Sequence, residues 1–518
     1  MAWSAGKPRA GRRSEAMRKF WLVFALGVAV AGCAGVPSLA LRQQSVDASI
    51  ASCERALELM DAAIDRAGVR DAADARIPGL LYLRANRFAA SFAGDTLNAA
   101  QFAQWVDAME ELALAARDAE LANLPAPGLD ALAAGLAALG FPARPASDSA
   151  KDCSRRLKAH DMSDDEVRAG IQAAVRVPDA YDYWMRVVGL YPLTTIPFHW
   201  GIQRWLRETV EVFNRPLAEL AVRGRLVRYA PAPGPSPLTR EQVADLIARA
   251  TRNPLGIPEF DAAESAALAA TFAPEFEIDE IDENDRIGQP AIGADGAPQV
   301  EPAASIAFAG ISYARIGGEV LPQLTYTVWF KSRPKSGRFD LLGGKIDGLV
   351  WRVTVASDGR PLLYDSIHPC GCYHLFFPTP RLALRDQPAS AEEPALVPQR
   401  LPQTEPSDRI VLRIAPGTHY IERVLVHAPG RGAAVPYAIA GQNRLRKLPF
   451  GAGGTRSFYD PEGFVRGSER AERVLFWPMG VPRAGAMRQW GRQATAFIGT
   501  RHFDDPRLME RYFLRVIP

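Results

Sequence analysis

The period of the hydrophobic pattern changes near Phe276, and this change constrains the fold more than any other feature of the chain. From about residue 45, apolar residues recur every three or four positions, which is the spacing of amphipathic helices. Beyond Phe276 they recur at every second position, which is the spacing of strands with one buried face. The sequence therefore predicts an α+β fold, with an α-helical domain over residues 45–273 and a mainly antiparallel, β-rich domain over residues 274–518.

The β-rich half contains several segments with the composition of strands. They lie at 324–330, 349–355, 362–368, 410–414, 420–426, 474–477 and 494–498. Asp358 and Gly359 separate the second and third segments, and an Asp-Gly pair in this position favours a hairpin. Asp505 and Pro506 suit the N-cap and the first position of a helix, so we expect a short C-terminal helix.

The N-terminus has the pattern of an export signal. Arg18 and Lys19 precede a run of twelve apolar or small residues, Phe20 to Ala31. Such a run is too short to span a bilayer, which takes about 20 residues. A basic head followed by a short apolar run is typical of a secretory signal peptide, which we assign to residues 1–32.

The apolar run ends in Val30-Ala31-Gly32-Cys33, which resembles the bacterial lipobox. The resemblance covers this segment only. It implies that Cys33 becomes the lipidated first residue of the mature protein and that residues 33–44 form a tether to the membrane. Because Asp does not follow the cysteine, it also implies sorting to the outer membrane, with the protein facing the periplasm.

Two further cysteines, Cys53 and Cys153, lie in the predicted helical half. The periplasm is oxidising, so we predict a disulfide between them. Closing a loop of this length contributes up to about 4.7 kcal/mol to stability in the chain-entropy model. The alternative is that both are small, buried apolar side chains.

The densest group of reactive side chains is His368-x-Cys370-x-Cys372-x-His374. Alternate residues of a strand share a face, so this spacing is a candidate row of metal ligands. In a straight strand, however, the two histidines would lie about 20 Å apart. Four ligands of one Zn²⁺ each lie about 2.0–2.3 Å from the ion, so a single site requires the chain to bend.

Pro369 and Gly371 favour such a bend, because proline fixes φ and glycine accepts positive φ. We therefore expect both sulfurs and at least one of the two imidazoles to converge in a pocket. Additional ligands would come from elsewhere in the chain. The candidates are His419, His427, His502 and Asp504.

The net charge of the chain says little more about its function. The first 32 residues hold six Lys or Arg and one acid, so the 55 basic and 57 acidic residues that follow give a net charge of −2. No nucleic-acid partner is expected from this balance. The acidic run at 279–285 lacks the glycine placement of a Ca²⁺ loop, and we interpret it as a solvated linker.

Three interpretations of the Cys/His segment remain open. In the first, the protein is a periplasm-facing envelope lipoprotein that binds a soft or borderline metal ion, Zn or Cu, through thiolates and imidazoles. In the second, it is a thiol-dependent enzyme that uses Cys370 or Cys372 with a histidine base. In the third, it is a structural or interaction lipoprotein without site chemistry. In each case the expected partner is the membrane, through the lipid on Cys33.

Overall fold

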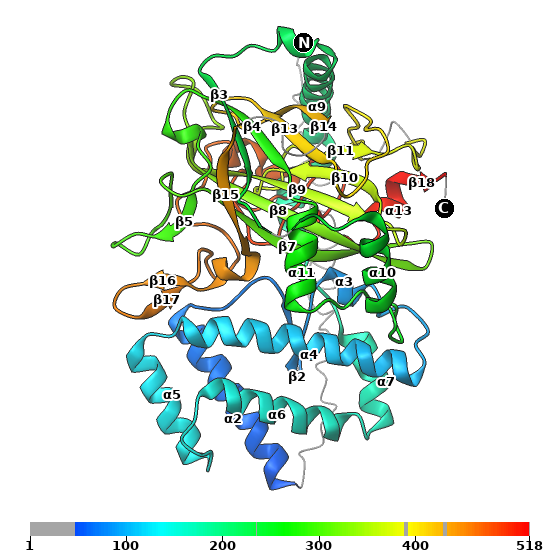
Figure 1. The fold of residues 1–518 in the computed structure, drawn as a ribbon. Helices are drawn as coiled ribbons and strands as arrows, with labels where there is room; N and C mark the ends of the chain where they lie inside the picture. The colour runs from blue at the N-terminus through cyan, green and yellow to red at the C-terminus, as the bar shows by residue number, and fades with distance from the viewer. Residues whose placement is uncertain (1–46, 235, 388–391, 428–432, 517–518) are drawn as a thin grey trace, which may run out of the picture.

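The computed structural model describes residues 47–234, 236–387, 392–427 and 433–516. The predicted signal peptide, the lipidation site Cys33 and the tether lie outside these ranges. The described chain is α+β, with most helices in the first half and a large sheet in the second, as predicted (Figure 1). No helix in the described ranges is long and apolar enough to cross a membrane.

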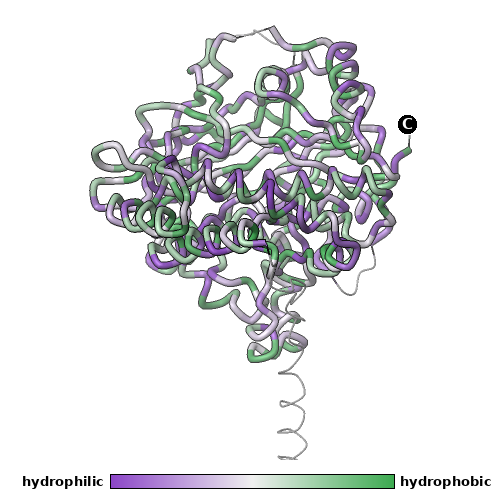
Figure 2. Tube along the Cα trace, turned by 90° about the horizontal axis from the view of Figure 1, so that it is seen from below, coloured by the Kyte–Doolittle hydropathy of each residue, from purple (hydrophilic) through white to green (hydrophobic). Residues whose placement is uncertain are grey.

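The first half forms a helical unit with its own core. Its helices are α2 (Ala48–Ala67), α3 (Arg87–Ala90), α4 (Ala99–Ala122), α5 (Ala126–Ala138), α6 (Ala146–Asp161) and α7 (Asp165–Ala174). A short hairpin, β1 (Ala75–Ile77) and β2 (Leu80–Ala85), packs among them. Hydrophilic and hydrophobic residues are interleaved along the helices seen from below in Figure 2, as expected for helices that bury one face.

The predicted disulfide links two of these helices. Cys53 of α2 and Cys153 of α6 are bonded, with their Cα atoms 4.9 Å apart. Both side chains are buried in the core of the helical unit. The bond therefore joins helices that lie side by side although 100 residues separate the two cysteines.

The second half is built on a ten-stranded sheet in which most neighbours are antiparallel. Its spatial order is β11 (Leu375–Pro378), β10 (Pro361–Ile367), β9 (Gly344–Val355), β8 (Glu319–Arg333), β7 (Ile306–Ile316), β15 (Val435–Gly441), β3 (Arg225–Pro231), β4 (Glu275–Glu280), β13 (Arg409–Ile414) and β14 (Ile421–His427). The pairs β7–β15, β15–β3 and β4–β13 are parallel. The predicted hairpin joins β9 to β10, with Gly359 at φ +84°.

The packing divides the chain earlier than the hydrophobic period suggested. Helices α9 (Tyr191–Asn214), α10 (Arg240–Ala250) and α11 (Ala262–Thr271) share the core of the large sheet, and β3 is one of its strands. The helical unit's own core is formed mainly by residues 50–177. The period of the apolar residues identified these helices but not the sheet against which they pack. An apolar stripe on a helix can pack equally well against other helices or against a sheet.

Two predicted strands are wrong. Residues 474–477 fall in the short helix α12 (Arg473–Phe476) and the 3₁₀ turn that follows it, and a short apolar run is compatible with either type of structure. Residues 494–498 form no strand and make only an isolated bridge from Ala494 to His502. The predicted C-terminal helix is present as α13 (Leu508–Tyr512).

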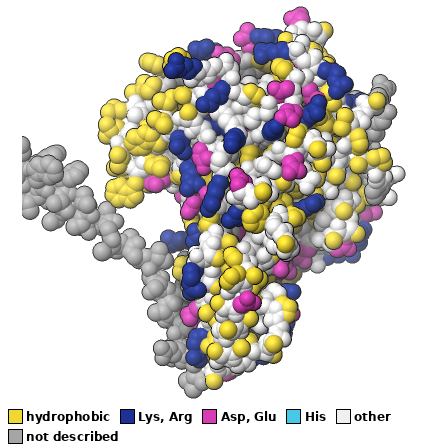
Figure 3. Space-filling model, turned by 90° about the vertical axis from the view of Figure 1, so that its left-hand side faces the viewer, with side chains coloured by type: hydrophobic (Ala, Val, Ile, Leu, Met, Phe, Trp, Pro, Cys, Tyr) yellow, Lys and Arg dark blue, Asp and Glu magenta, His cyan; other side chains and the backbone are white. Residues whose placement is uncertain are grey.

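Short hairpins, 3₁₀ turns and a small helix lie outside the large sheet. They are α8 (Tyr183–Val188), β5 (Gln289–Ile292) with β6 (Pro298–Glu301), β12 (Leu382–Leu384) with β18 (Phe513–Arg515), β16 (Leu448–Phe450) with β17 (Gly454–Arg456), and the 3₁₀ turns η1 (Leu217–Glu219), η2 (Glu283–Asp285), η3 (Gln442–Arg446) and η4 (Trp477–Met479). On the face shown in Figure 3, basic and acidic side chains are interspersed, and hydrophobic side chains gather at one edge.

Candidate active site

The Cys/His segment forms a tight turn between β10 and β11. The amide of Gly371 donates to the carbonyl of His368 at 2.8 Å, and the amide of His368 donates to the carbonyl of Cys372 at 3.0 Å. Gly371 has φ +94°, and a Cβ at this position would overlap the carbonyl oxygen of Ala494. Only glycine fits such a place. The predicted bend is therefore confirmed.

The bend does not bring the two histidines together. Ser366 of β10 pairs with Leu375 of β11, so these two side chains share one face of the sheet. His368, two residues after Ser366, lies on that face as well. His374 precedes Leu375 by one residue and therefore lies on the opposite face, with Asp365 and Ile367. The two imidazoles therefore leave the sheet in opposite directions.

His374 lies against the buried ion pair of Arg352 and Asp365. Its Nε2 lies 3.1 Å from Oδ2 of Asp365, and Arg352 donates from two nitrogens to the same carboxylate. Burial lowers the pKa of His374 to about 4, although Asp365 acts in the opposite direction. A fully enclosed, neutral imidazole of this kind stabilises the sheet and does not face a cavity.

His368 belongs to a second buried network, which joins residues far apart in sequence. Its Nδ1 lies 3.5 Å from Oδ1 of Asp347, and Nδ1 of His419 lies 2.8 Å from the other oxygen of the same carboxylate. The second ring nitrogen of His419, Nε2, lies 3.5 Å from Asp285, at ion-pair distance but without hydrogen-bond geometry. His419 also stacks on Phe330, with ring centroids 3.9 Å apart.

The network shifts the pKa values of its two imidazoles in opposite directions. Burial lowers the pKa of His368, and Arg333 and His419 add to the decrease. For His419 burial acts in the same direction, but its two carboxylate neighbours outweigh burial and raise the pKa. The pKa of Asp347 is well below its usual range, because both histidines favour its charged form more than burial disfavours it. His419 therefore takes up a proton at a higher pH than His368 does.

His368 borders a cavity of about 310 Å³ between the two edges of the sheet. β10 and β11 line one side, the β13–β14 connection lines another, and α9 lies across it with Trp205. Tyr373 and Tyr420 stand beside His368, with ring centroids 5.1 and 5.6 Å from the imidazole. Arg333 donates to the hydroxyl of Tyr420 at 3.1 Å.

The backbone around this cavity is strained. Five residues other than glycine have positive φ in the described ranges, and Ile346, Tyr373 and His419 are three of them. Ile346 precedes Asp347, while Tyr373 and His419 belong to the site themselves. Left-handed backbone costs a β-branched or bulky residue of the order of 1–3 kcal/mol and persists where the surroundings over-determine it, often at functional sites.

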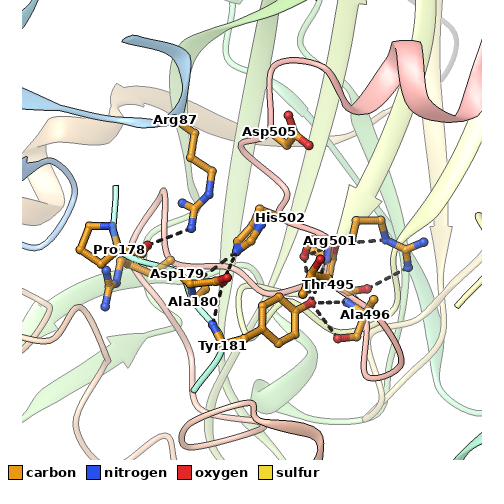
Figure 4. Close-up of polar contacts among 12 residues, drawn as sticks. Arg87, Pro178, Asp179, Ala180, Tyr181, Thr495, Ala496, Arg501, His502 and Asp505 are labelled. Carbon is orange, nitrogen blue, oxygen red and sulfur yellow. Dashed lines mark hydrogen bonds and ion pairs between the residues drawn. The ribbon is translucent and has the colours of Figure 1, made fainter. Parts of the chain in front are cut away.

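The remaining candidate ligands have other partners. His502 lies with Nε2 2.9 Å from Oδ1 of Asp179, and the ring meets Tyr181 edge to face (Figure 4). Asp504 pairs with Arg87 at 3.2 Å. These contacts attach the segment around Asp179 to the C-terminal loops. The side chain of His427, the last residue of β14, lies outside the described part of the structure.

The predicted metal site is not formed by the described residues. Cys370 is a buried free thiol and Cys372 a partly exposed one. Within the ranges that the structure describes, no three or more His, Cys, Asp or Glu side chains are placed to hold a metal ion. The polar atoms of His368, Asp347 and His419 face one another instead. The turn sends His374 to Asp365 and His368 toward Asp347, while Cys370 and Cys372 remain neighbours. Metal binding by this row therefore stays a prediction.

Sequence reasoning missed most of the network. Asp347 and Arg333 lie in strands without a motif, and Tyr373 and Tyr420 were not singled out as site residues. Asp285 belongs to the acidic run interpreted as a solvated linker, yet it is buried and accepts the amide of Gly417 at 2.6 Å. That interpretation is wrong, because the run contributes part of β4 and the turn that supports His419.

The chain was compared with protein-family models, with curated proteins and with solved structures, and none of the three comparisons gave a match.

Proposed function

We propose that the protein is an enzyme that uses His368 as a general base in the cavity beneath α9. The observation that carries this proposal is the position of His368, which lines the cavity while its Nδ1 faces Asp347. A carboxylate in this position favours the tautomer with the proton on Nδ1 and leaves Nε2 as the basic atom. The lowered pKa keeps the imidazole unprotonated at neutral pH.

Tyr420 supplies the complementary acid group. Burial raises the pKa of Tyr420 to about 12, so its hydroxyl keeps its proton and can donate it to a substrate oxygen. Arg333 donates to that hydroxyl oxygen, which strengthens the hydroxyl as a donor. Positioned donors of this kind stabilise the oxyanion that develops when water adds to a carbonyl group.

The cavity wall indicates the size and polarity of the substrate. Its apolar part is formed by Trp205, Val212, Leu220, Leu349, Leu375 and Ile421. Arg215, Arg223 and Glu422 are the charged residues of the wall. A volume of about 310 Å³ suits a small molecule with an apolar body and one polar group. Hydrolysis of an ester or related acyl bond is the reaction that a base and a hydroxyl donor carry out in such a cavity, with water activated by His368.

The test uses chromogenic p-nitrophenyl esters of short and medium acyl chains. We expect saturable hydrolysis by the wild-type protein and a loss of about 10²–10⁴-fold in kcat/KM for His368→Asn. His502→Asn is the matched control, because it changes a histidine whose partner, Asp179, lies outside this network. Equal rates for the wild type and His368→Asn on every ester, or an equal loss in His502→Asn, would contradict the proposal.

We also propose that this enzyme is a lipoprotein of the outer membrane, facing the periplasm and anchored through Cys33. The support is the lipobox-like segment at the N-terminus, together with the disulfide between Cys53 and Cys153. Disulfides of this kind persist in oxidising compartments such as the periplasm.

A further inference from the structure

The two free thiols lie at a second cavity, on the other side of Tyr373. This cavity has a volume of about 490 Å³ and is lined by Cys372 together with apolar side chains of α9 and of the C-terminal loops, among them Phe198, Phe476 and Phe497. Cys370 lies behind it, 5% exposed, in a hydrophobic cluster. The accessible sulfur is therefore that of Cys372, and Cys370 is its enclosed neighbour.

The two side chains interact with each other. The amide of Cys372 donates to Sγ of Cys370 at 3.4 Å. The neighbouring thiol of Cys370 is the main reason that the pKa of Cys372 is well above its usual value, and burial adds to the increase. The turn therefore holds the backbone of Cys372 against Sγ of Cys370 and keeps the two cysteines side by side.

Arg488 supplies a positive charge that lacks a conventional partner. It is 3% exposed, and it donates to the backbone carbonyls of Arg492 and Pro482. Its Nε has no hydrogen-bond partner among the described residues. Burial lowers the pKa of its guanidinium to about 10, and the thiols of Cys370 and Cys372 are the first groups that oppose this decrease. A buried cation without a carboxylate is costly, and a thiolate at either cysteine would offset that cost, since both thiols act to raise the pKa of this guanidinium.

We propose that Cys370 and Cys372 form a reversible dithiol–disulfide centre that accepts two electrons from small thiols entering the second cavity. This activity is separate from the acid–base chemistry assigned to His368. The guanidinium of Arg488 stabilises the thiolate of the reduced form and has no such partner once the disulfide has formed. The reduced form is thus favoured, which makes the disulfide an oxidant.

Two substrate thiols are consumed for each protein disulfide that is reduced. The thiolate of the first attacks Sγ of Cys372, the Cys370–Cys372 bond breaks, and Cys370 leaves as the thiolate that faces Arg488. The second thiolate attacks the substrate sulfur of the mixed disulfide and releases Cys372. The substrate pair is oxidised to a disulfide, the protein disulfide is reduced to two thiols, and the two substrate protons end on the cysteines or in solvent. Exchange with a small disulfide of the glutathione class runs the same steps in reverse and restores the oxidised form.

Glu472 is placed to handle the proton of the incoming thiol. It lines the same cavity as Cys372, and burial raises its pKa to about 7. A carboxylate with this pKa accepts a proton from a thiol and returns it near neutral pH. The aromatic wall of the cavity favours a thiol with an apolar or uncharged body over a strongly charged one.

The experiment equilibrates the folded, full-length protein with mixtures of reduced and oxidised glutathione. Remaining thiols are then trapped by alkylation and located by peptide mass analysis. We expect a Cys370–Cys372 disulfide whose fraction follows the glutathione ratio, while the Cys53–Cys153 bond stays closed. Cys370→Ser should accumulate a mixed disulfide of glutathione with Cys372, whereas Cys372→Ser should leave Cys370 unmodified.

The role of Arg488 is tested by the same titration. Arg488→Met removes the charge and should favour the disulfide by at least tenfold in the equilibrium constant, whereas Arg488→Lys should lie close to the wild type. Arg492→Met is the matched control, since that side chain interacts with Arg87 and Asp504 and not with the thiols. Two free thiols at every glutathione ratio would overturn the proposal, as would a shift in Arg492→Met equal to that in Arg488→Met. Neither outcome depends on whether His368 is a base.

Discussion

Nδ1 of His419 lies 2.8 Å from Oδ2 of Asp347, and this contact leaves the other oxygen of the carboxylate for His368. Asp347 is therefore shared between two imidazoles, at hydrogen-bond distance from His419 and at ion-pair distance, 3.5 Å, from His368. The strained backbone at Ile346 and at His419 lies next to this contact, at its two ends. The proposed role of His368 as a base depends on this shared carboxylate.

Removing the charge of Asp347 should impair catalysis more than folding. Asp347→Asn retains the size of the side chain but presents an amide to His368, so the imidazole loses the partner that selects its tautomer. We expect a decrease of about 10²–10⁴-fold in kcat on the p-nitrophenyl esters, with a smaller effect on KM. Steady-state kinetics check this, and circular dichroism confirms that the variant is folded. A changed KM at constant kcat would show that Asp347 serves binding alone.

His374 should make stability depend on pH. Its folded-state pKa is about 4, below the ordinary value of 6.5, so the unfolded chain binds the proton first as the pH falls. The contribution is complete above pH 6.5 and is lost progressively between 6.5 and about 4, on the order of 3 kcal/mol in total.

The comparison that isolates His374 is urea unfolding of the wild type and of His374→Gln over this pH range. The variant should lose less unfolding free energy on acidification than the wild type does. His502→Gln serves as the control, because its side chain is not enclosed in the sheet. Parallel curves for the wild type and His374→Gln would show that folding does not lower the pKa of this imidazole.

The disulfide in the helical unit should contribute measurably to stability. A double variant, Cys53→Ser with Cys153→Ser, opens a loop of 100 residues in the unfolded chain. We expect a loss of about 2–5 kcal/mol in the free energy of unfolding of the helical unit. Denaturant unfolding followed by fluorescence measures it, and the wild type in reducing buffer should behave like the variant. Identical midpoints in oxidising and reducing buffer would refute the contribution.

The lipid anchor is tested independently of the fold. Cys33→Ala removes the residue that the lipobox resemblance assigns to lipidation, so the protein should leave the membrane fraction or retain its signal peptide. Fractionation and intact-mass measurement distinguish these cases. Unchanged membrane retention with an unchanged processed mass would show that Cys33 is not the anchor.

The sequence predicted the local features of the site well. The Asp358-Gly359 hairpin, the end of β10 before Pro369 and the bend at Gly371 all follow from turn chemistry that acts over a few residues. The disulfide followed from counting cysteines in an expected oxidising compartment. Such features depend on neighbours in sequence, so a single chain is enough to infer them.

The network around His368 could not be predicted in the same way. Asp347 precedes its partner His419 by 72 residues, and only the order of strands in the sheet brings them together. His374 shows the opposite error, in which closeness in sequence suggested closeness of side chains. The register of β10 with β11 sends it to the other face, and register cannot be deduced from spacing alone.

The central claim is most directly tested by histidine-ring NMR of protein carrying ¹⁵N-labelled histidine, with signals assigned from His368→Asn and His419→Asn. The nitrogen shifts report both the charge and the tautomer of each ring. We predict that at pH 7 His368 is neutral with its proton on Nδ1 and titrates below pH 6.5, while His419 titrates above 6.5. A charged His368 at pH 7, or a neutral ring with the proton on Nε2, would contradict its assignment as the base.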